Sequence, residues 1–126
     1  MPFEYALLRA VPRVDRGECV NVGVLLYCRE SGFLQGAVHL DEARLRMLDD
    51  QVDVEAVRSV LAGLLAVCAA EPAAGRAGRG SPRVRFGWLT APRSTVVQAG
   101  PVHGGMTADP ALELTRLLTR LVLTPS

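Results

Sequence analysis

The chain has 126 residues, of which 49% are hydrophobic and 21% are charged, and its formal net charge is +1 at pH 7. This length suits a single domain over residues 1–126, and this composition is ordinary for a soluble globular protein. No apolar run approaches the roughly 18 residues that cross a bilayer, and the N-terminus lacks the basic segment of a signal peptide, so we expect a cytoplasmic protein without a membrane partner.

The first forty residues predict three strands joined by short turns. Apolar residues mark the strands at 3–12, 19–27 and 33–40. Gly17, in the turn D-R-G-E, supplies the positive φ that a tight hairpin needs. Sequential strands on short connections favour an antiparallel meander.

Helical periodicity follows the third strand. Residues 41–50 predict a short helix with acidic residues in its first turn, and Asp53 is a candidate N-cap for a longer helix over 54–70. Apolar residues recur there at spacings of three and four, which predicts a wide apolar face. The stretch 71–83 is rich in Gly, Ala and Arg and predicts a flexible loop.

The last third of the chain predicts two more strands and a helix. Residues 84–90 and 95–98 are predicted as strands, and 99–107 as an irregular Gly-rich loop. Asp109 is predicted to cap a final helix that begins at Pro110. The order strand–strand–strand–helix–helix–strand–strand–helix predicts an α+β fold, with an antiparallel sheet of about five strands and the helices packed on one face.

Strand alternation assigns side chains to the two faces of this sheet. The face beneath the helices would hold Val20, Val22, Val24 and Leu26. The other face would be polar and would gather Arg9, Arg13, Asn21, Gln35, His39, Arg83 and Arg85, with Leu25, Tyr27 and Phe33 toward one end. A one-residue slip would reverse a strand's assignment. A solvated face is common in antiparallel sheets, and the functional alternative is a surface for an acidic protein or an anionic ligand.

Two positions within the second strand are unusual for a strand. Asn21 and Gly23 have poor strand propensity, and a glycine there often marks a bulge or a close approach by another backbone or a ligand. The preceding turn holds Asp15, Arg16 and Glu18, which could form a catalytic acid pair with an arginine. The same residues are more typical of a polar hairpin tip.

Arginine supplies every basic charge, since the chain contains no lysine. Residues 72–93 hold five arginines and no acid, and this run could contact the phosphates of a nucleic acid. Against this, the sequence pI of about 7.8 is below that of dedicated nucleic-acid-binding domains.

A loop histidine suggests a different site. His103 lies in the Gly-rich loop, and a loop histidine near an arginine can act in acid–base or phosphate chemistry. An enzyme or a sensor for a phosphorylated or nucleotide ligand would require five residues to converge in one pocket: Arg16, Glu18, Asn21, Arg93 and His103. Neither the phosphate-binding loop motif nor the dinucleotide-binding fingerprint is present.

The cysteines and histidines show no metal-binding spacing. Cys19, Cys28 and Cys68 form no C-x-x-C pair, and their number is odd. His39 and His103 form no H-x-x-x-H pair. We therefore expect reduced, buried thiols and no metal or other cofactor.

Two segments resemble a known bacterial family. The most specific pieces are the run R-G-E-C-V-N-V-G-V at 16–24 and the run W-L-T-A-P-R-S at 88–94, and the resemblance covers nearly the whole chain. The family is the one catalogued as domain of unknown function number 3037. The resemblance implies no assigned activity. It implies a small, free-standing protein that is often encoded beside a HipA-like kinase, and hence a companion role.

We expect a non-catalytic interaction or regulatory module. Its partner would be a protein such as a HipA-like kinase, or a second copy of the chain through exposed aromatic residues at 27 and 33. The candidate binding residues are Arg13, Arg16, Glu18, Asn21, Gly23, Arg83, Arg85, Arg93 and His103. The first alternative is an enzyme or sensor for a phosphorylated or nucleotide ligand, and the second is nucleic-acid binding through 76–93.

Overall fold

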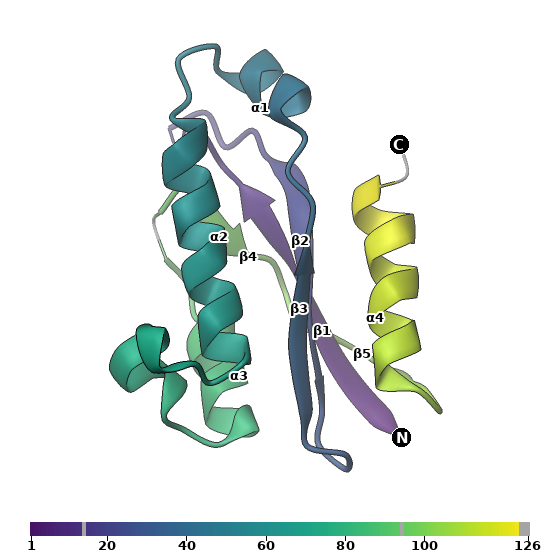
Figure 1. Cartoon of the computed structure of the whole chain (residues 1–126). Coiled ribbons are helices and arrows are strands. Elements are labelled where there is room, and N and C mark those ends of the chain that lie inside the picture. Colours follow the sequence, from purple (N-terminus) through teal and green to yellow (C-terminus); the bar gives the residue numbers. More distant parts are fainter. Residues whose placement is uncertain (14, 94, 124–126) are drawn as a thin grey trace.

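The computed structural model describes residues 1–13, 15–93 and 95–123 (Figure 1). Within these residues, five strands form one open antiparallel sheet: β1 (Pro2–Ala10), β2 (Val20–Cys28), β3 (Phe33–Val38), β4 (Val97–Ala99) and β5 (His103–Met106). The order across the sheet is β3-β2-β1-β4, and β5 pairs with the first half of β1. The predicted α+β fold with five antiparallel strands is confirmed.

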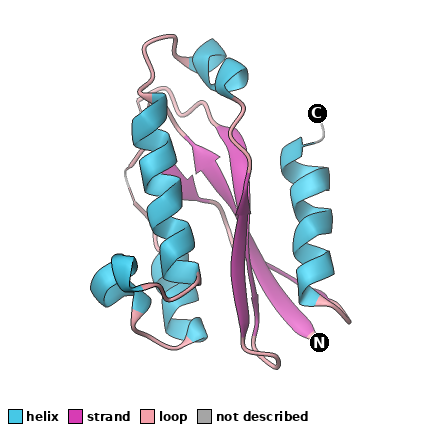
Figure 2. Cartoon of the chain, viewed as in Figure 1, coloured by secondary structure: helices cyan, strands magenta, loops and turns pink. Residues whose placement is uncertain are grey.

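Helices cover both faces of this sheet (Figure 2). The helical elements are α1 (Glu42–Leu48), α2 (Val54–Cys68), the 3-10 helix η1 (Pro72–Gly78), α3 (Pro82–Thr90), α4 (Pro110–Leu118) and its π-helical continuation η2 (Thr119–Leu123). One hydrophobic cluster lies beneath α2 and α3, and a second lies beneath α4. The prediction that all helices pack on one face is therefore wrong. In the described part of the chain, no helix is long and apolar enough to span a bilayer.

A β-bulge in β2 changes which of its side chains face α2. Leu8 of β1 pairs with Gly23, but the next residue, Arg9, pairs with Asn21, so Val22 is an extra residue on β2. An extra residue interrupts the alternation of side chains between the two faces. In β2, the even-numbered residues Val20 and Val22 therefore face α2, whereas beyond the bulge the odd-numbered residues Leu25 and Tyr27 do so.

This reversal changes the predicted faces. The β2 residues in the cluster beneath α2 are Val20, Val22, Leu25 and Tyr27, whereas Val24, Leu26 and Cys28 belong to the cluster beneath α4. Placing Val24 and Leu26 on one face with Val20 is thus wrong. Tyr27, predicted to be exposed, is buried and its ring lies 5.4 Å from that of Phe86, centroid to centroid. Because β2 is buried on both sides, its run V-L-L-Y-C is uninterrupted.

Residues 84–90, predicted as a strand, belong to the helix α3. Ser81 caps this helix by accepting a hydrogen bond from the Val84 backbone N–H at 3.3 Å, and Pro82 occupies the first turn. The buried residues of α3 are Phe86 and Leu89, which are three positions apart as a helix requires. Arg83 and Arg85 consequently lie on a helix and not on the polar sheet face.

Two predicted loops contain short regular elements. Segment 71–83 includes η1, in which Gly78 is buried beside Ala74. Segment 99–107 includes β5, whose residues H-G-G-M are all exposed. No alternation marks β5 in the sequence, so its pairing with β1 and not its propensity makes it a strand.

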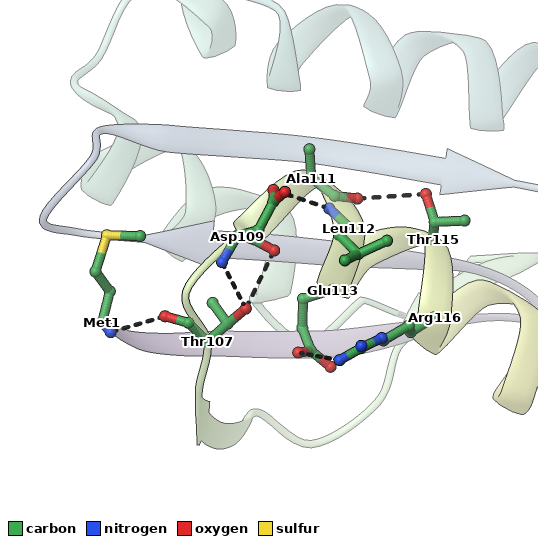
Figure 3. A network of polar contacts seen from close by, with 8 residues as sticks. All are labelled: Met1, Thr107, Asp109, Ala111, Leu112, Glu113, Thr115 and Arg116. Atoms are coloured by element: carbon green, nitrogen blue, oxygen red, sulfur yellow. Dashed lines mark hydrogen bonds and ion pairs between the residues drawn. The ribbon is translucent and has the colours of Figure 1, made fainter.

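The start of β1 is tied to the beginning of α4 (Figure 3). The Met1 amino group donates to the Thr107 carbonyl at 2.7 Å, and the Thr107 N–H donates to the Met1 carbonyl at 2.9 Å. Thr107 Oγ1 also accepts from the Asp109 N–H at 3.1 Å, and Asp109 accepts from the Leu112 N–H at 3.2 Å. The predicted cap at Asp109, followed by Pro110, is confirmed, and it fixes α4 against the sheet.

Candidate functional site

The unusual strand residues Asn21 and Gly23 are explained by packing within the chain. Asn21 Nδ2 donates to the Leu121 carbonyl at 3.1 Å, which ties the bulge to η2. A Cβ on Gly23 would lie 2.9 Å from the Ala37 carbonyl oxygen and 2.9 Å from Val38 Cγ1. The close approach predicted at this glycine is therefore made by β3. Asn21 and Gly23 therefore connect β2 to η2 and to β3, respectively.

The turn around Gly17 is an exposed tip with local ion pairs. Gly17 has φ +70°, as the hairpin prediction requires. Arg13 pairs with Asp15 at 3.6 Å, and Arg16 pairs with Glu18 at 2.5 Å. Such exposed pairs contribute about 0–1 kcal/mol. Each of these arginines already has an acidic partner beside it.

His103 lies far from this turn. It pairs with Tyr5 in the sheet, and the two rings are 5.3 Å apart, centroid to centroid. From Tyr5 to Ala10, five strand residues of about 3.3 Å each span roughly 16 Å before the chain reaches the turn. Asn21 and Arg93 are also separated, because Asn21 contacts η2 and Arg93 contacts α3 on the other face. The predicted pocket that joins the turn, Arg93 and His103 is not formed.

Arg85 caps the end of α2. Its Nη2 donates to the Cys68 carbonyl at 3.3 Å, and its Nη1 donates to the Gly80 carbonyl at 2.7 Å. A cation at the carbonyl end of a helix is stabilised by the helix dipole. Arg85 is thus occupied within the fold, whereas Arg83 on the same helix is exposed.

The three cysteines differ in exposure. Cys28 and Cys68 are buried, as predicted, but Cys19 is exposed because it lies in the turn before β2. Burial raises the pKa of the Cys68 thiol to about 11, and the charge of Arg85 offsets only part of this effect. Cys68 therefore stays protonated and unreactive at neutral pH.

Arg93 is held in place at the end of α3. Its guanidinium donates to the Leu89 carbonyl at 3.3 Å and to the Trp88 carbonyl. The same group lies 4.1 Å from the centroid of the Trp88 ring, which is a cation–π contact. These contacts fix the position of the Arg93 charge beside a Trp88 side chain that is 42% exposed.

Arg93 borders a hollow of about 390 Å³ beside β4, which we call the Arg9–Arg93 hollow. Its lining includes Arg9, Thr90, Arg93, Gln98 and Gly100, and none of its lining residues is acidic. A Cβ on Gly100 would lie 2.9 Å from Arg9 Cζ, so the glycine lets this guanidinium lie against the backbone. Among the described residues, the Arg9 guanidinium has no hydrogen-bond or ion-pair partner.

A second depression of about 360 Å³ adjoins the first, and we call it the Trp88 groove. Its lining includes Val60, Gly63 and Leu64 of α2, Ala74 and Ala77 of η1, and Trp88 of α3. Arg93 lines both depressions, so they meet at its side chain. None of the residues that line the groove is acidic, and its surface is mainly apolar.

Three further arginines lie on η1, directly after it and on α3, and none of them lines either depression. Arg76, Arg79 and Arg83 are exposed, and within the described chain they make no ion pair. The basic run predicted at 72–93 therefore divides into two arginines that cap helices and three that face solvent. In the same part of the chain, no group of three or more His, Cys, Asp or Glu residues is placed to hold a metal ion.

The sequence did not single out Arg9 or Trp88 as binding residues. Arg9 was predicted only as one member of a polar face, and Trp88 was placed on a strand. The hollow depends on the pairing of Arg9 with Gln98, which lie 89 positions apart (98 − 9). The glycine at position 100, directly after a short strand, is the local signal that could have indicated a close approach there.

The comparisons with known proteins identify a family but no function. A family model described as protein of unknown function (DUF3037) matches residues 5–122. Both runs that carry the resemblance, 16–24 and 88–94, lie inside this range. No curated protein and no solved structure is significantly similar to the chain. Because the match covers nearly all of its residues, the chain belongs to the DUF3037 family.

Proposed function

We propose that the protein is a non-catalytic regulatory module that binds an acidic segment of a partner protein at the Arg9–Arg93 hollow. The observation that carries this proposal is the state of Arg9. Its guanidinium lies against Gly100, has no partner among the described residues, and faces a hollow without carboxylates. An arginine fork of this kind binds a carboxylate through two parallel hydrogen bonds.

The lining of the hollow favours binding over catalysis. General acid–base and nucleophilic chemistry need a group such as His, Cys, Asp or Glu at the reacting atoms. Among the described residues that line the hollow, the side chains that can form hydrogen bonds are those of Arg9, Thr90, Arg93 and Gln98. These donors hold an anion in place but offer no base.

The partner to test first is a HipA-like kinase, because the family resemblance implies a protein that is often encoded beside one. The proposal places both proteins in the cytoplasm. The structural support is the charge of the hollow, because Arg9 and Arg93 line it and none of its described lining residues is acidic. Such a surface also increases the association rate with an acidic partner.

A phosphorylated small ligand is the second candidate. The observation that favours it is the size of the hollow, since about 390 Å³ lies within the range of roughly 300–1,000 Å³ of small-molecule sites. Titration calorimetry with inorganic phosphate and with ATP tests this candidate. Saturable binding of either compound that Arg9→Ala abolishes would support it over a protein partner.

The proposal is tested by titrating the purified 126-residue chain with a purified HipA-like kinase encoded beside a member of the family. We expect binding of the wild type, and at least a tenfold loss for Arg9→Ala, since removing one member of a charged pair typically costs 2 kcal/mol or more, about 30-fold in Kd. Arg44→Ala is the matched control, because Arg44 is an exposed arginine on α1 that lines neither depression. Thermal melts verify that both variants fold.

Two results would overturn this function. One is the absence of wild-type binding to the kinase. The other is an affinity of Arg9→Ala equal to that of Arg44→Ala, which would show that only the overall charge matters.

A further inference from the structure

The Trp88 groove is an open apolar surface next to the Arg9–Arg93 hollow. Val60 and Trp88, which border it, are 36% and 42% exposed. Single exposed apolar residues are common, but here they line one depression together with small residues of η1. Water would be displaced from this depression by an apolar side chain of matching size.

Gly63 keeps part of this groove empty. It lies in the interior of α2, where glycine is less favourable than alanine by about 1 kcal/mol. A Cβ at this position would meet no heavy atom within 4 Å, so no close packing within the described chain requires a glycine there. The glycine therefore costs helix stability and leaves space on the face that borders the groove.

The charges around the groove specify its occupant. Arg93 lies over Trp88 and lines both depressions, so one guanidinium is shared between an apolar site and a cationic site. No acidic residue lines either depression. An occupant with apolar and acidic groups close together satisfies both, because the cation at the rim would attract its carboxylates.

We infer that the Trp88 groove binds an apolar side chain of the same acidic partner segment that reaches the Arg9–Arg93 hollow. The partner would thus be recognised by a short motif in which a large apolar residue is flanked by acidic ones. This inference rests on the proposed function and adds the apolar half of the motif. Apolar anchors in pockets typically dominate such interfaces, and charges at the rim direct their approach.

Trp88 allows a direct test, because it is the only tryptophan in the chain and its fluorescence reports on the groove. The probes are three capped peptides: Glu-Glu-Leu-Glu-Glu, Glu-Glu-Ser-Glu-Glu and Gln-Gln-Leu-Gln-Gln. We expect the first to bind at least tenfold more tightly than either of the others. We also expect only the first to shift and intensify the Trp88 emission, since a leucine in the groove excludes water from the ring.

A pair of substitutions at one position gives the matched control. Gly63→Leu places a branched side chain at the border of the groove, and we expect it to lower the affinity for the leucine peptide to that for the serine peptide. Gly63→Ala adds only a methyl group, and we expect less than a threefold change. Thermal melts on both variants show whether α2 is intact, and Val60→Asp provides a second way to block the groove.

The outcomes separate the two proposals. If the leucine and serine peptides bind equally and Arg9→Ala weakens both, the hollow binds acidic segments but the inferred role of the groove is overturned. If none of the peptides binds, or if Arg9→Ala has no effect on binding, the proposed function fails as well. If Trp88 emission changes with protein concentration alone and sedimentation shows a dimer, the groove is occupied by a second copy and the inference is wrong.

Discussion

Two glycines in or next to the sheet, Gly23 and Gly100, differ in what approaches them. At Gly23, the neighbour is the backbone of β3, and the adjacent Asn21 donates to the carbonyl of Leu121. At Gly100, the neighbour is the guanidinium of Arg9, which has no further partner in the described chain. Gly23 and Asn21 are thus satisfied by contacts within the chain, whereas beside Gly100 the Arg9 guanidinium is left without a partner among the described residues.

The same division applies to the arginines. Arg85 donates through Nη2 to the Cys68 carbonyl at the end of α2 and through Nη1 to the Gly80 carbonyl, although its buried Nε has no partner among the described residues. Arg9 lies in a hollow without acceptors of opposite charge. An unusual residue in a strand or a basic run thus indicates function only when the rest of the chain does not already satisfy it.

The largest loss of stability expected from a single substitution is at Gly23. Gly23→Ala should lower the free energy of unfolding by about 2 kcal/mol, because its Cβ would lie 2.9 Å from a carbonyl oxygen that cannot move away freely. Gly63→Ala is the control, since its Cβ meets nothing and its helix gains up to about 1 kcal/mol. Urea denaturation measures both. A Gly23→Ala variant as stable as the wild type would contradict the tight approach of β3.

The stability of the protein at alkaline pH tests whether the Cys68 thiol is buried in the folded state. Its pKa is raised from 9.0 to about 11, so the folded state disfavours the thiolate. The associated stability is fully present below pH 9 and is lost as pH rises toward 11, by about 2 to 3 kcal/mol. We expect unfolding curves of the wild type to lose more stability over this range than those of Cys68→Ala. Parallel pH profiles would show that the thiol is not buried.

Asn21→Ala should cost about 1 kcal/mol of stability, because it removes the hydrogen bond to Leu121. Hydrogen exchange should show faster opening of η2, whereas the partner affinity should stay unchanged. An Asn21→Ala variant that folds normally but fails to bind the kinase would show that Asn21 contacts the partner and is not only a structural residue.

The smallest expected effect on stability is at Gly100. Gly100→Ala displaces only the far end of the Arg9 side chain, so we expect the free energy of unfolding to change by less than about 0.5 kcal/mol, as at ordinary surface sites. Affinity for the glutamate–leucine peptide should nevertheless fall several-fold, because the guanidinium leaves its position. If both stability and affinity are unchanged, Gly100 has no part in positioning Arg9.

Local sequence signals predicted the elements that they specify directly. The three N-terminal strands, the φ of Gly17, and the caps at Asp53 and Asp109 all agree with the structure. Each of these depends on residues within a few positions of one another. The face assignment failed because one extra residue, Val22, reverses the alternation. Asn21 and Gly23 indicated a bulge or a close approach at this point, but not which of the two, so the alternation was continued through it.

The candidate site was predicted less completely for a related reason. Arg93 is among the predicted residues, but the predicted pocket joins it to the wrong ones. The alternation in V-R-F-G-W predicts a strand where the structure has the helix α3. The cap at Ser81 and the proline at position 82 were local signals for a helix that this alternation masked. The hollow itself depends on long-range pairing of β1 with β4, which no local pattern encodes.

The central claim is that the fold leaves the Arg9 guanidinium unpaired beside the Arg9–Arg93 hollow, where a partner can bind it. The most direct measurement follows the side-chain Nε–Hε signals of the arginines in a ¹⁵N-labelled sample, assigned with Arg9→Ala and Arg85→Ala spectra, during titration with the Glu-Glu-Leu-Glu-Glu peptide. We expect the Arg9 signal to shift and saturate while the Arg85 signal stays in place, because Arg85 is already bonded to two carbonyls. An Arg9 signal that does not move, or an Arg85 signal that moves equally, would contradict the claim.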